Sequence, residues 1–180
     1  MTFVAGSSWQ PDEDLFIEYF NQHPEVKLII APHVIDENHL VEIIRKLKRP
    51  YVRYTRADEK NVRKADCLIV DCFGLLSSIY RYGEIAYIGG GFGVGIHNTL
   101  EAAVYGIPVI FGPKYQKFQE AIQLLEAKGA FSVKDYEELK TLLDRMLTDE
   151  VFLRESGMNA SNYVTGNAGA TDKIMSMINF

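Results

Sequence analysis

The sequence predicts an α/β fold, a doubly wound parallel sheet of Rossmann-like type with helices on both faces. Short apolar runs rich in Val, Ile and Tyr alternate with longer segments of helical pattern along the 180 residues. This alternation is typical of right-handed βαβ units and therefore of a parallel sheet. No internal repeat, low-complexity tract or linker interrupts it, so residues 1–180 are predicted to form a single domain.

Strands and helices are expected in strict alternation along most of the chain. The predicted strands are the short apolar runs at residues 3–5, 26–30, 51–54, 67–70, 86–88, 108–111 and 130–133. The predicted helices are the longer segments at 11–21, 36–47, 75–80, 99–105, 116–128 and 135–146, followed by two terminal helices at about 150–164 and 168–178.

Several helix ends carry recognisable signals. Pro11 suits the first position of a helix, and the acidic run 12–14 opposes the positive end of the helix dipole. Gly106 and Gly129 are expected to end two helices, because glycine tolerates the backbone conformation found there. Ligands of such folds bind beyond the carboxyl ends of the strands, so the residues that follow each strand are the candidate site.

Composition narrows the class of protein. The chain is 47% hydrophobic and 24% charged, with a net charge of -5 and basic residues that are scattered, so nucleic acid is not expected as a partner. Cys67 and Cys72 form neither a CxxC pair nor a disulfide framework, and no run approaches the length of a membrane-spanning helix. We expect a cytoplasmic protein. Met1 stands directly before the first strand, so we also expect a domain cut from a longer, two-domain protein.

The segment at residues 89–98 is the strongest candidate for a binding loop. It contains five glycines in seven residues, follows a predicted strand and opens a predicted helix. Glycine lets the backbone approach a ligand closely, and a helix start favours a phosphate or carboxylate, so Gly90 and Gly91 are candidate contacts. The alternative is a mobile surface turn. The segment matches neither the P-loop nor the dinucleotide-binding pattern.

Asn98 and Glu101 have two readings. In a capping box, Asn98 caps the helix and Glu101 reaches back to the Asn98 N–H. In a ligand site, the Glu101 carboxylate accepts hydrogen bonds from the two hydroxyls of a ribose. The spacing alone favours the capping box.

Polar residues follow three other predicted strands. Ser7 and Ser8 follow the first strand and either bind a phosphate or carboxylate or serve as turn residues. His33 follows the second strand, where it either faces an anion or is an ordinary polar residue. Lys114 and Lys117 follow the sixth strand and either supply positive charge or point into solvent.

No catalytic or metal centre is expected in the chain. The four histidines lack metal-ligand spacing, and the nucleophile pattern GxSxG is absent. No general base is evident among the residues that follow the strands. The combination predicts a binding half whose catalytic base lies elsewhere.

Taken together, these segments resemble the C-terminal domain of the 3-deoxy-D-manno-octulosonate (Kdo) transferases, which adopt the GT-B fold. Residues 73–121 resemble the family pattern GxLxxxYxxAxxAxxGGxxxxxGHNxLEPAxxGxPVxxGPxxxNFxE. The matching residues are Gly74, Leu76, Tyr80, Gly89, Gly90, His97, Asn98, Leu100, Glu101, Gly106, Pro108, Gly112, Pro113, Phe118 and Glu120. GSSWQPDED, at residues 6–14, resembles the family's GST-H-xxE-E segment, and residues 166–170 resemble its C-terminal signature.

The resemblance implies the donor-binding domain of an enzyme that adds Kdo from CMP-Kdo to a lipid A precursor in lipopolysaccharide biosynthesis. It implies that Ser7, Ser8, the glycine loop, Asn98 and Glu101 hold CMP-Kdo, with Glu101 on the ribose. It also implies an inverting glycosyltransferase that needs no cofactor or metal. Its acidic base and lipid acceptor site would lie in an N-terminal domain, and the full-length protein would contact the cytoplasmic face of the bacterial inner membrane. The chain alone is then expected to be inactive.

The chain departs from the family pattern at the expected phosphate contacts. The family's Pro-Arg-His-Pro is replaced by Pro32-His33-Val34, which lacks the arginine. Lys114 and Lys117 replace a His and an Asn of the family, and Trp9 stands where a His is common. One of the two lysines is expected to supply part of the missing charge.

Two alternatives remain open at this point. One is a GT-B protein that uses a UDP-sugar, as a glycosyltransferase or a UDP-GlcNAc 2-epimerase. The other is a non-catalytic domain that binds a protein partner and whose glycine loop is only a turn.

Overall fold

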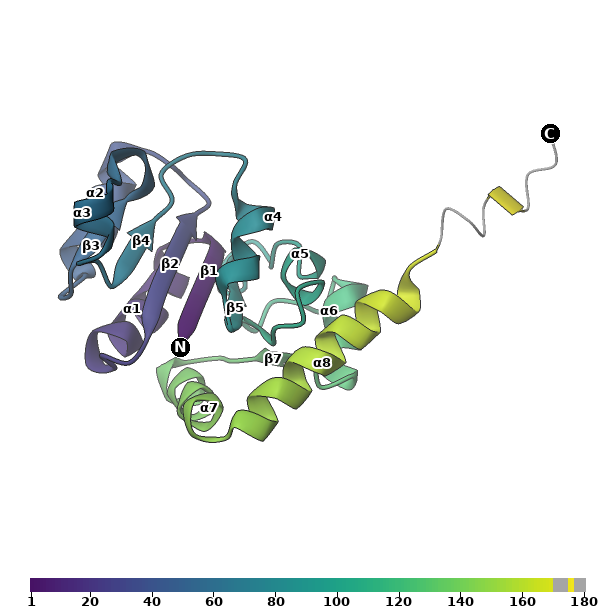
Figure 1. Ribbon diagram of the computed structural model, residues 1–180. Coiled ribbons are helices and arrows are strands. Elements are labelled where there is room, and N and C mark those ends of the chain that lie inside the picture. The colour runs from purple at the N-terminus through teal and green to yellow at the C-terminus, as the bar shows by residue number, and fades with distance from the viewer. Residues whose placement is uncertain (170–174, 177–180) are drawn as a thin grey trace.

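The computed structural model describes residues 1–169 and 175–176 and contains one sheet of parallel strands (Figure 1). The order across the seven-stranded sheet is β3-β4-β2-β1-β5-β6-β7. All seven predicted strands are present, as β1 Thr2–Ser8, β2 Lys27–Pro32, β3 Tyr51–Arg53, β4 Cys67–Ile69, β5 Ile85–Ile88, β6 Val109–Phe111 and β7 Ala130–Ser132. The prediction of an α/β fold with a parallel sheet is therefore confirmed.

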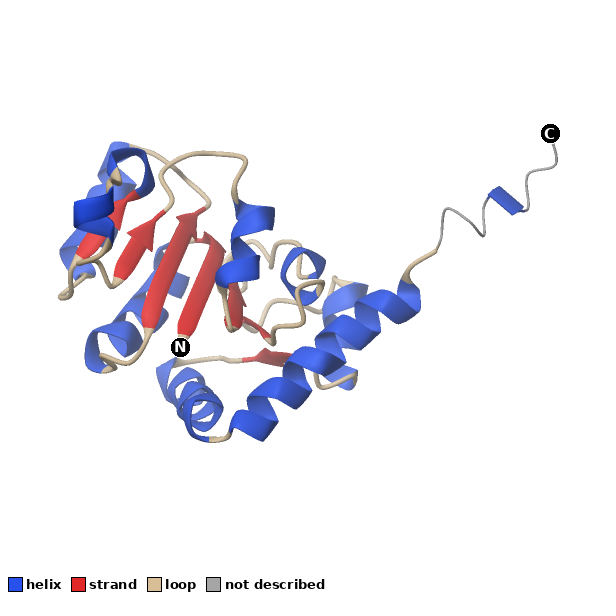
Figure 2. Ribbon diagram, viewed as in Figure 1, coloured by secondary structure: helices blue, strands red, loops and turns tan. Residues whose placement is uncertain are grey.

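Helices connect the strands and cover both faces of the sheet (Figure 2). They are α1 Gln10–Gln22, α2 Glu37–Lys46, α3 Glu59–Val62, α4 Leu76–Ile79, α5 Leu100–Ala103, α6 Gln119–Glu126, α7 Tyr136–Thr148 and α8 Glu150–Asn167, with two 3₁₀ turns at η1 Tyr54–Arg56 and η2 Tyr80–Tyr82. Among the described residues no helix is long and apolar enough to cross a membrane.

Two apolar layers lie on opposite sides of the sheet. Neighbouring side chains of a strand point to opposite faces, so Phe3 and Ala5 of β1 enter one layer and Val4 enters the other. The first layer packs on α1, α2 and α7, and the second on α4, α5, α6 and α8. Each large apolar side chain buried in these layers contributes about 1.5–3 kcal/mol.

Helix ends follow the expected chemistry with one change. Gly106 ends α5 in the left-handed region, with φ of 70°. After α6 the left-handed residue is Lys128, with φ of 59°, and not Gly129. Gly129 is required for a different reason, because a Cβ there would lie 2.6 Å from the Cα and N atoms of Ala160 in α8.

Helix boundaries are the part of the prediction that needed most correction. Sequence patterns did not predict η1 or α3, and α3 is capped by the Asp58 side chain. α6 begins at Gln119 and not at residue 116, because Tyr115 and Phe118 form a turn first. α8 continues to Asn167 as one helix, and the second predicted terminal helix, at 168–178, lies largely outside the described residues.

Candidate functional site

The crevice between β1 and β5 is the point where the strand order reverses. β1 pairs with β2 on one side and with β5 on the other, so the segments that leave β1 and β5 diverge at the carboxyl edge of the sheet. In open parallel sheets this position forms the ligand site. The residues that follow β1, β2, β5 and β6 meet there.

The glycine loop after β5 is held by its own backbone. The Gly90 carbonyl accepts hydrogen bonds from Gly93 N at 3.0 Å and Gly95 N at 3.1 Å, and His97 N donates to the Gly89 carbonyl at 3.2 Å. Gly90 and Gly95 have φ of 94° and 118°, in the region that disfavours side chains. The loop therefore has a defined conformation in which backbone groups form its surface.

The loop after β6 packs against the glycine loop without intervening side chains. A Cβ on Gly91 would lie 2.6 Å from the Cα and N atoms of Gly112. Lys114 adds two hydrogen bonds, from its N–H to the Gly91 carbonyl at 2.9 Å and from Nζ to the Gly93 carbonyl at 3.0 Å. Lys117 is exposed in the turn before α6. Of the two predicted cations, Lys114 thus lies on the glycine loop.

Asp12, in the first turn of α1, joins the two sides of the crevice. Its side chain is buried and accepts three hydrogen bonds of 2.9 Å, from Trp9 N, Gly90 N and the Tyr87 hydroxyl. Burial raises the pKa of this carboxyl, and the hydrogen bonds from Gly90, Trp9 and Tyr87 oppose that shift. Asp12 therefore fixes the position of the glycine loop relative to α1.

The two serines after Gly6 have different environments. Ser8 is fully buried and its hydroxyl donates to Glu13 Oε1 at 2.9 Å, so this hydroxyl is engaged inside the protein and not at the crevice. Ser7 is half-buried at the edge, with φ of 52°, an unusual conformation for a residue other than glycine. Only Ser7 lines a cavity at this edge.

Glu13 is the second buried carboxyl behind the crevice. Its Oε1 lies 3.0 Å from Nε2 of His39, in addition to the Ser8 contact, while Oε2 has no hydrogen-bond partner among the described residues. Burial raises its pKa, and His39 and Ser8 oppose the shift. Glu13 holds α1 against the end of β1 and the side of α2.

Three rings stack beside the glycine loop. The His33 ring lies on Trp9 at a centroid distance of 4.6 Å and on His97 at 4.5 Å, with interplanar angles of 26° and 27°. Trp9 Nε1 also donates to His97 Nε2 at 3.4 Å. Burial and the neighbouring His33 lower the pKa of His97, while the charges of Asp12 and Glu101 oppose the shift. We call these three residues the Trp-His-His stack.

Asn98 and Glu101 do not form a capping box with the helix backbone. Asn98 Oδ1 accepts from Leu100 N at 3.0 Å, and its side-chain amide donates to Glu101 Oε1 at 3.2 Å. The Glu101 carboxylate is therefore bound to a side chain and not to the Asn98 N–H. A cavity of about 430 Å³, lined by His97, Asn98, Thr99, Phe118, Glu120 and neighbouring apolar residues, opens beside these residues.

A second cavity lies beside His33, at the ends of β1 and β2 and the segment after β4. It has a volume of about 220 Å³ and is lined mainly by apolar residues, with Ser7 and His33 as its polar members. Phe73 and Leu76, which follow β4, form its far wall. Ligand pockets are typically lined by apolar side chains, with a few polar groups that orient the ligand.

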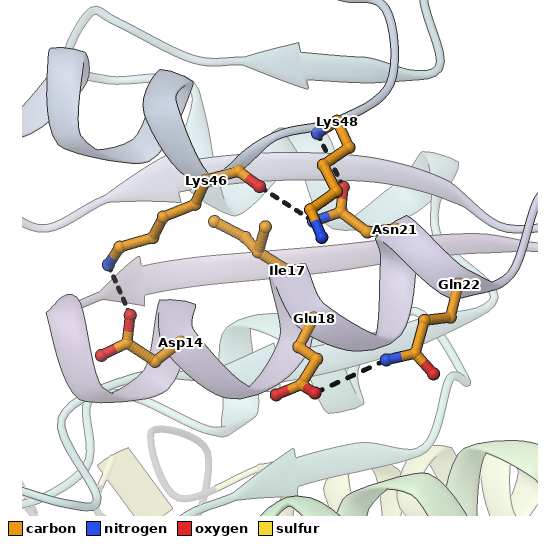
Figure 3. A pocket seen from close by; sticks show the side chains of 7 residues that line it. All are labelled: Asp14, Ile17, Glu18, Asn21, Gln22, Lys46 and Lys48. Atoms are coloured by element: carbon orange, nitrogen blue, oxygen red, sulfur yellow. Dashed lines mark hydrogen bonds and ion pairs between the residues drawn. The ribbon is translucent and has the colours of Figure 1, made fainter.

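A groove elsewhere on the molecule is crossed by contacts between two helices. It measures about 350 Å³ and lies between α1 and α2 (Figure 3). Lys46 pairs with Asp14 at 2.6 Å, and Asn21 binds the Lys46 carbonyl and the Lys48 N–H (Figure 3). These contacts join the two helices, so we assign the groove a structural role. In the described part of the chain no three His, Cys, Asp or Glu side chains are grouped to hold a metal ion.

Four residues of this site are not predicted by the sequence patterns. In the sequence, Trp9 is only a departure from the family pattern, His97 and Glu120 are only matches to it, and Asp12 is only an acid at a helix start. The feature that could have identified them is their position, since each follows a strand or lies near the start of a helix at the carboxyl edge of the sheet.

Comparisons with known proteins identify relatives of the chain, although no family model matches it. A 3-deoxy-D-manno-octulosonic acid transferase of Aquifex aeolicus (strain VF5) is 35% identical over 151 residues, which cover 81% of this chain and 41% of that protein. The chain thus spans about two fifths of the length of this curated relative.

Two solved structures share the fold. The C-terminal CMP-Kdo binding domain of WaaA from Acinetobacter baumannii superposes with a TM-score of 0.78 at 19% identity, over 91% of this chain and 89% of that one. Anabaena Alr3699/HepE, in complex with UDP and glucose, superposes with a TM-score of 0.69 at 12% identity, over 98% of this chain and 48% of that one.

The sequence relationship and the fold point to the same group of proteins. The fold is the Rossmann-like α/β fold of GT-B glycosyltransferase domains. Further 3-deoxy-D-manno-octulosonic acid transferases match the chain, including one of Rickettsia typhi that is 32% identical over 97% of it. The chain is a homologue of the C-terminal domain of the 3-deoxy-D-manno-octulosonic acid transferases.

Proposed function

We propose that this chain binds the nucleotide sugar CMP-Kdo for a glycosyltransferase that adds Kdo to a lipid A precursor in lipopolysaccharide biosynthesis. Similarity to the transferases of Aquifex and Rickettsia supports this proposal. The observation that carries it is the hydrogen-bonded glycine loop at the β1–β5 crevice, which leads directly to Asn98 and Glu101.

The crevice offers a matching group for each part of such a donor. Glu101 accepts hydrogen bonds from the ribose hydroxyls, because its carboxylate is not used to cap the helix backbone. The phosphate lies against the glycine loop, near Ser7, Lys114 and the Trp-His-His stack. The apolar cavity between Ser7 and Phe73 accommodates the flat base.

The chemical step requires a group from outside this chain. A donor phosphate can leave without a metal when backbone dipoles and basic side chains stabilise its charge. The proposed catalytic base and lipid acceptor site belong to the part of the relatives that this chain does not cover, since it spans 41% of the Aquifex protein. In the complete enzyme we place the reaction at the cytoplasmic face of the inner membrane.

An amide-shift titration with CMP, UMP and GMP tests the proposal. We expect CMP to shift the backbone amides of residues 89–101 at lower concentration than UMP or GMP. Amides of the groove between α1 and α2 serve as the internal control and should not move. An absence of shifts at residues 89–101 up to millimolar CMP contradicts the proposal.

A UDP-sugar is the second candidate donor. This candidate is supported by the fold shared with Anabaena Alr3699/HepE, which was solved with UDP and glucose. The same loop and Glu101 would hold either nucleotide, because neither contact reads the base. Tighter binding of UDP than of CMP in the titration selects this second candidate.

A further inference from the structure

The Trp-His-His stack unites three separate segments at the crevice. Trp9 follows β1, His33 follows β2, and His97 lies between the glycine loop and α5. His33 is exposed, and both of its neighbours in the stack are half-buried. The exposed ring of the stack therefore borders the space into which the donor's anionic groups must come.

Few other positively charged side chains lie near the two cavities beside the stack. Neither the 430 Å³ cavity nor the 220 Å³ cavity is lined by an arginine or lysine of the described chain. Lys114 lies on the glycine loop, where its Nζ is bound to the Gly93 carbonyl. The acidic groups around the stack are Asp12 of α1, Glu101 of α5, and Glu120 of α6, which lines the same cavity as His97. An anion that enters here meets more negative than fixed positive charge.

We propose that the Trp-His-His stack is the anion-binding element of the donor site, and that it takes up one proton from solvent when an anionic donor binds. This inference rests on the proposed function and adds to it the source of the positive charge. It replaces the expectation that Lys114 or Lys117 supplies that charge.

The geometry decides which ring carries the proton. His97 Nε2 accepts a hydrogen bond from the Trp9 N–H, so this nitrogen is unprotonated and His97 is neutral. Burial and His33 also lower the pKa of His97. His33 is exposed and lies on the face of Trp9, which stabilises a cation through its π electrons. The proton therefore goes to His33, and Trp9 and His97 act as its support.

Calorimetric titration with a phosphodiester probe tests this coupling. The probe is cytidine 5′-(methyl phosphate), because a phosphodiester keeps one negative charge across the range, whereas the monoester of CMP titrates near pH 6. Titrations at pH 6.0 to 8.5, each in two buffers of different ionisation enthalpy, give the affinity and the number of protons taken up. We expect proton uptake that peaks within this range at no more than about one proton, and affinity that rises by up to about tenfold for each pH unit of acidification where the uptake is largest.

Two variants separate this role from a structural one. His33→Gln should abolish proton uptake and the pH dependence of affinity, with its largest loss of affinity at pH 6 and its smallest at pH 8.5. His23→Gln is the matched control, since His23 stacks on Tyr19 away from the crevice and should leave the proton uptake intact. Binding without proton uptake in the wild type, or uptake that persists in His33→Gln, overturns the inference alone. Failure of every cytidine and uridine nucleotide to bind at any pH overturns the proposed function and this inference with it.

Discussion

At the scale of single residues, the crevice depends on contacts between distant parts of the chain. Asp12 accepts hydrogen bonds from Tyr87 and Gly90, which lie 75 and 78 residues further along the sequence. The sequence alone identifies Asp12 as an acid that favours a helix start, but it does not reveal these partners. The same holds for the Trp-His-His stack, whose members come from three different connections. The glycine loop and Glu101 are candidates from the sequence alone because their signals are local.

Glu101→Gln should weaken nucleotide binding with little effect on stability. The amide has one acceptor oxygen in place of two charged ones, and hydrogen bonds to charged groups contribute about 1.5–3 kcal/mol, so we expect affinity for CMP to fall about 10- to 100-fold. The free energy of unfolding should change by less than about 0.5 kcal/mol, because Glu101 contacts the Asn98 side chain and not the helix backbone. Calorimetry and urea unfolding measure the two effects.

Asn98→Ala is the matching control for the cap. It removes the acceptor for Leu100 N and should lower the free energy of unfolding by about 1 kcal/mol. A large loss of stability in Glu101→Gln, with unchanged CMP affinity, would return Glu101 to a purely structural role.

At the scale of elements, strands were easier to predict than the short helices. Each strand is a short apolar run, which is the pattern expected of a parallel strand that is buried on both faces. α3 and η1 are short, polar segments that depend on capping by Asp58 and on the buried Asp71. Such segments lack a hydrophobic period, so sequence patterns did not separate them from loops.

Asp71 attaches η1 to the carboxyl end of β4. Its buried carboxylate accepts hydrogen bonds from Thr55 N at 2.9 Å, Thr55 Oγ1 at 2.6 Å and Arg53 Nε at 2.7 Å. Burial raises the pKa of Asp71, but the hydrogen bonds from Thr55 and Arg53 outweigh burial and hold the pKa below its ordinary value. The ionised form is therefore favoured in the folded state.

Asp71→Asn should destabilise the protein at neutral pH but not in acid. We expect a loss of about 2 kcal/mol at pH 7 in urea unfolding, because hydrogen bonds to a charged acceptor are removed. Because the folded pKa is lowered, this stabilisation is present above the unfolded pKa of 3.8 and is lost as the pH falls through the folded value. The difference between wild type and variant should therefore shrink below pH 4. Asp14→Asn, at a surface ion pair, should cost less than about 1 kcal/mol.

Two glycines of the same loop should respond differently to alanine. In Gly91→Ala the new Cβ meets the Gly112 backbone at 2.6 Å, so the loops after β5 and β6 must separate, at a cost of about 1–3 kcal/mol. In Gly93→Ala the nearest atom is the Gly90 carbonyl oxygen at 3.9 Å, and stability should change by less than about 0.5 kcal/mol. Urea unfolding compares the pair. Equal effects would show that the contact between the two loops is unimportant.

At the scale of the whole molecule, α8 packs on the helices that cover one face of the sheet. It packs against α5 and α6, and Gly157 lets it approach the turn after α5 closely. A Cβ at Gly157 would lie 2.2 Å from the Gly106 carbonyl oxygen. Gly157→Ala should therefore lower the free energy of unfolding by about 1–3 kcal/mol.

Gly166→Ala makes the same change in the same helix and serves as its control. Apart from its own helix, no described residue has an atom within 4 Å of the new Cβ, so the substitution should stabilise the helix by up to about 1 kcal/mol. Thermal or urea unfolding of both variants should give opposite signs. Two changes of the same sign would mean that backbone entropy, and not the approach to Gly106, governs Gly157.

β1 also determines how the protein can be handled in an experiment. Its seven residues run from Thr2 at one pole of the sheet to Ser8 at the crevice, a span of about 23 Å. Met1 therefore lies at the pole opposite the crevice (Figure 1). A biotin, dye or sensor-chip linker attached at the amino terminus should leave the mouth of the crevice open to nucleotides.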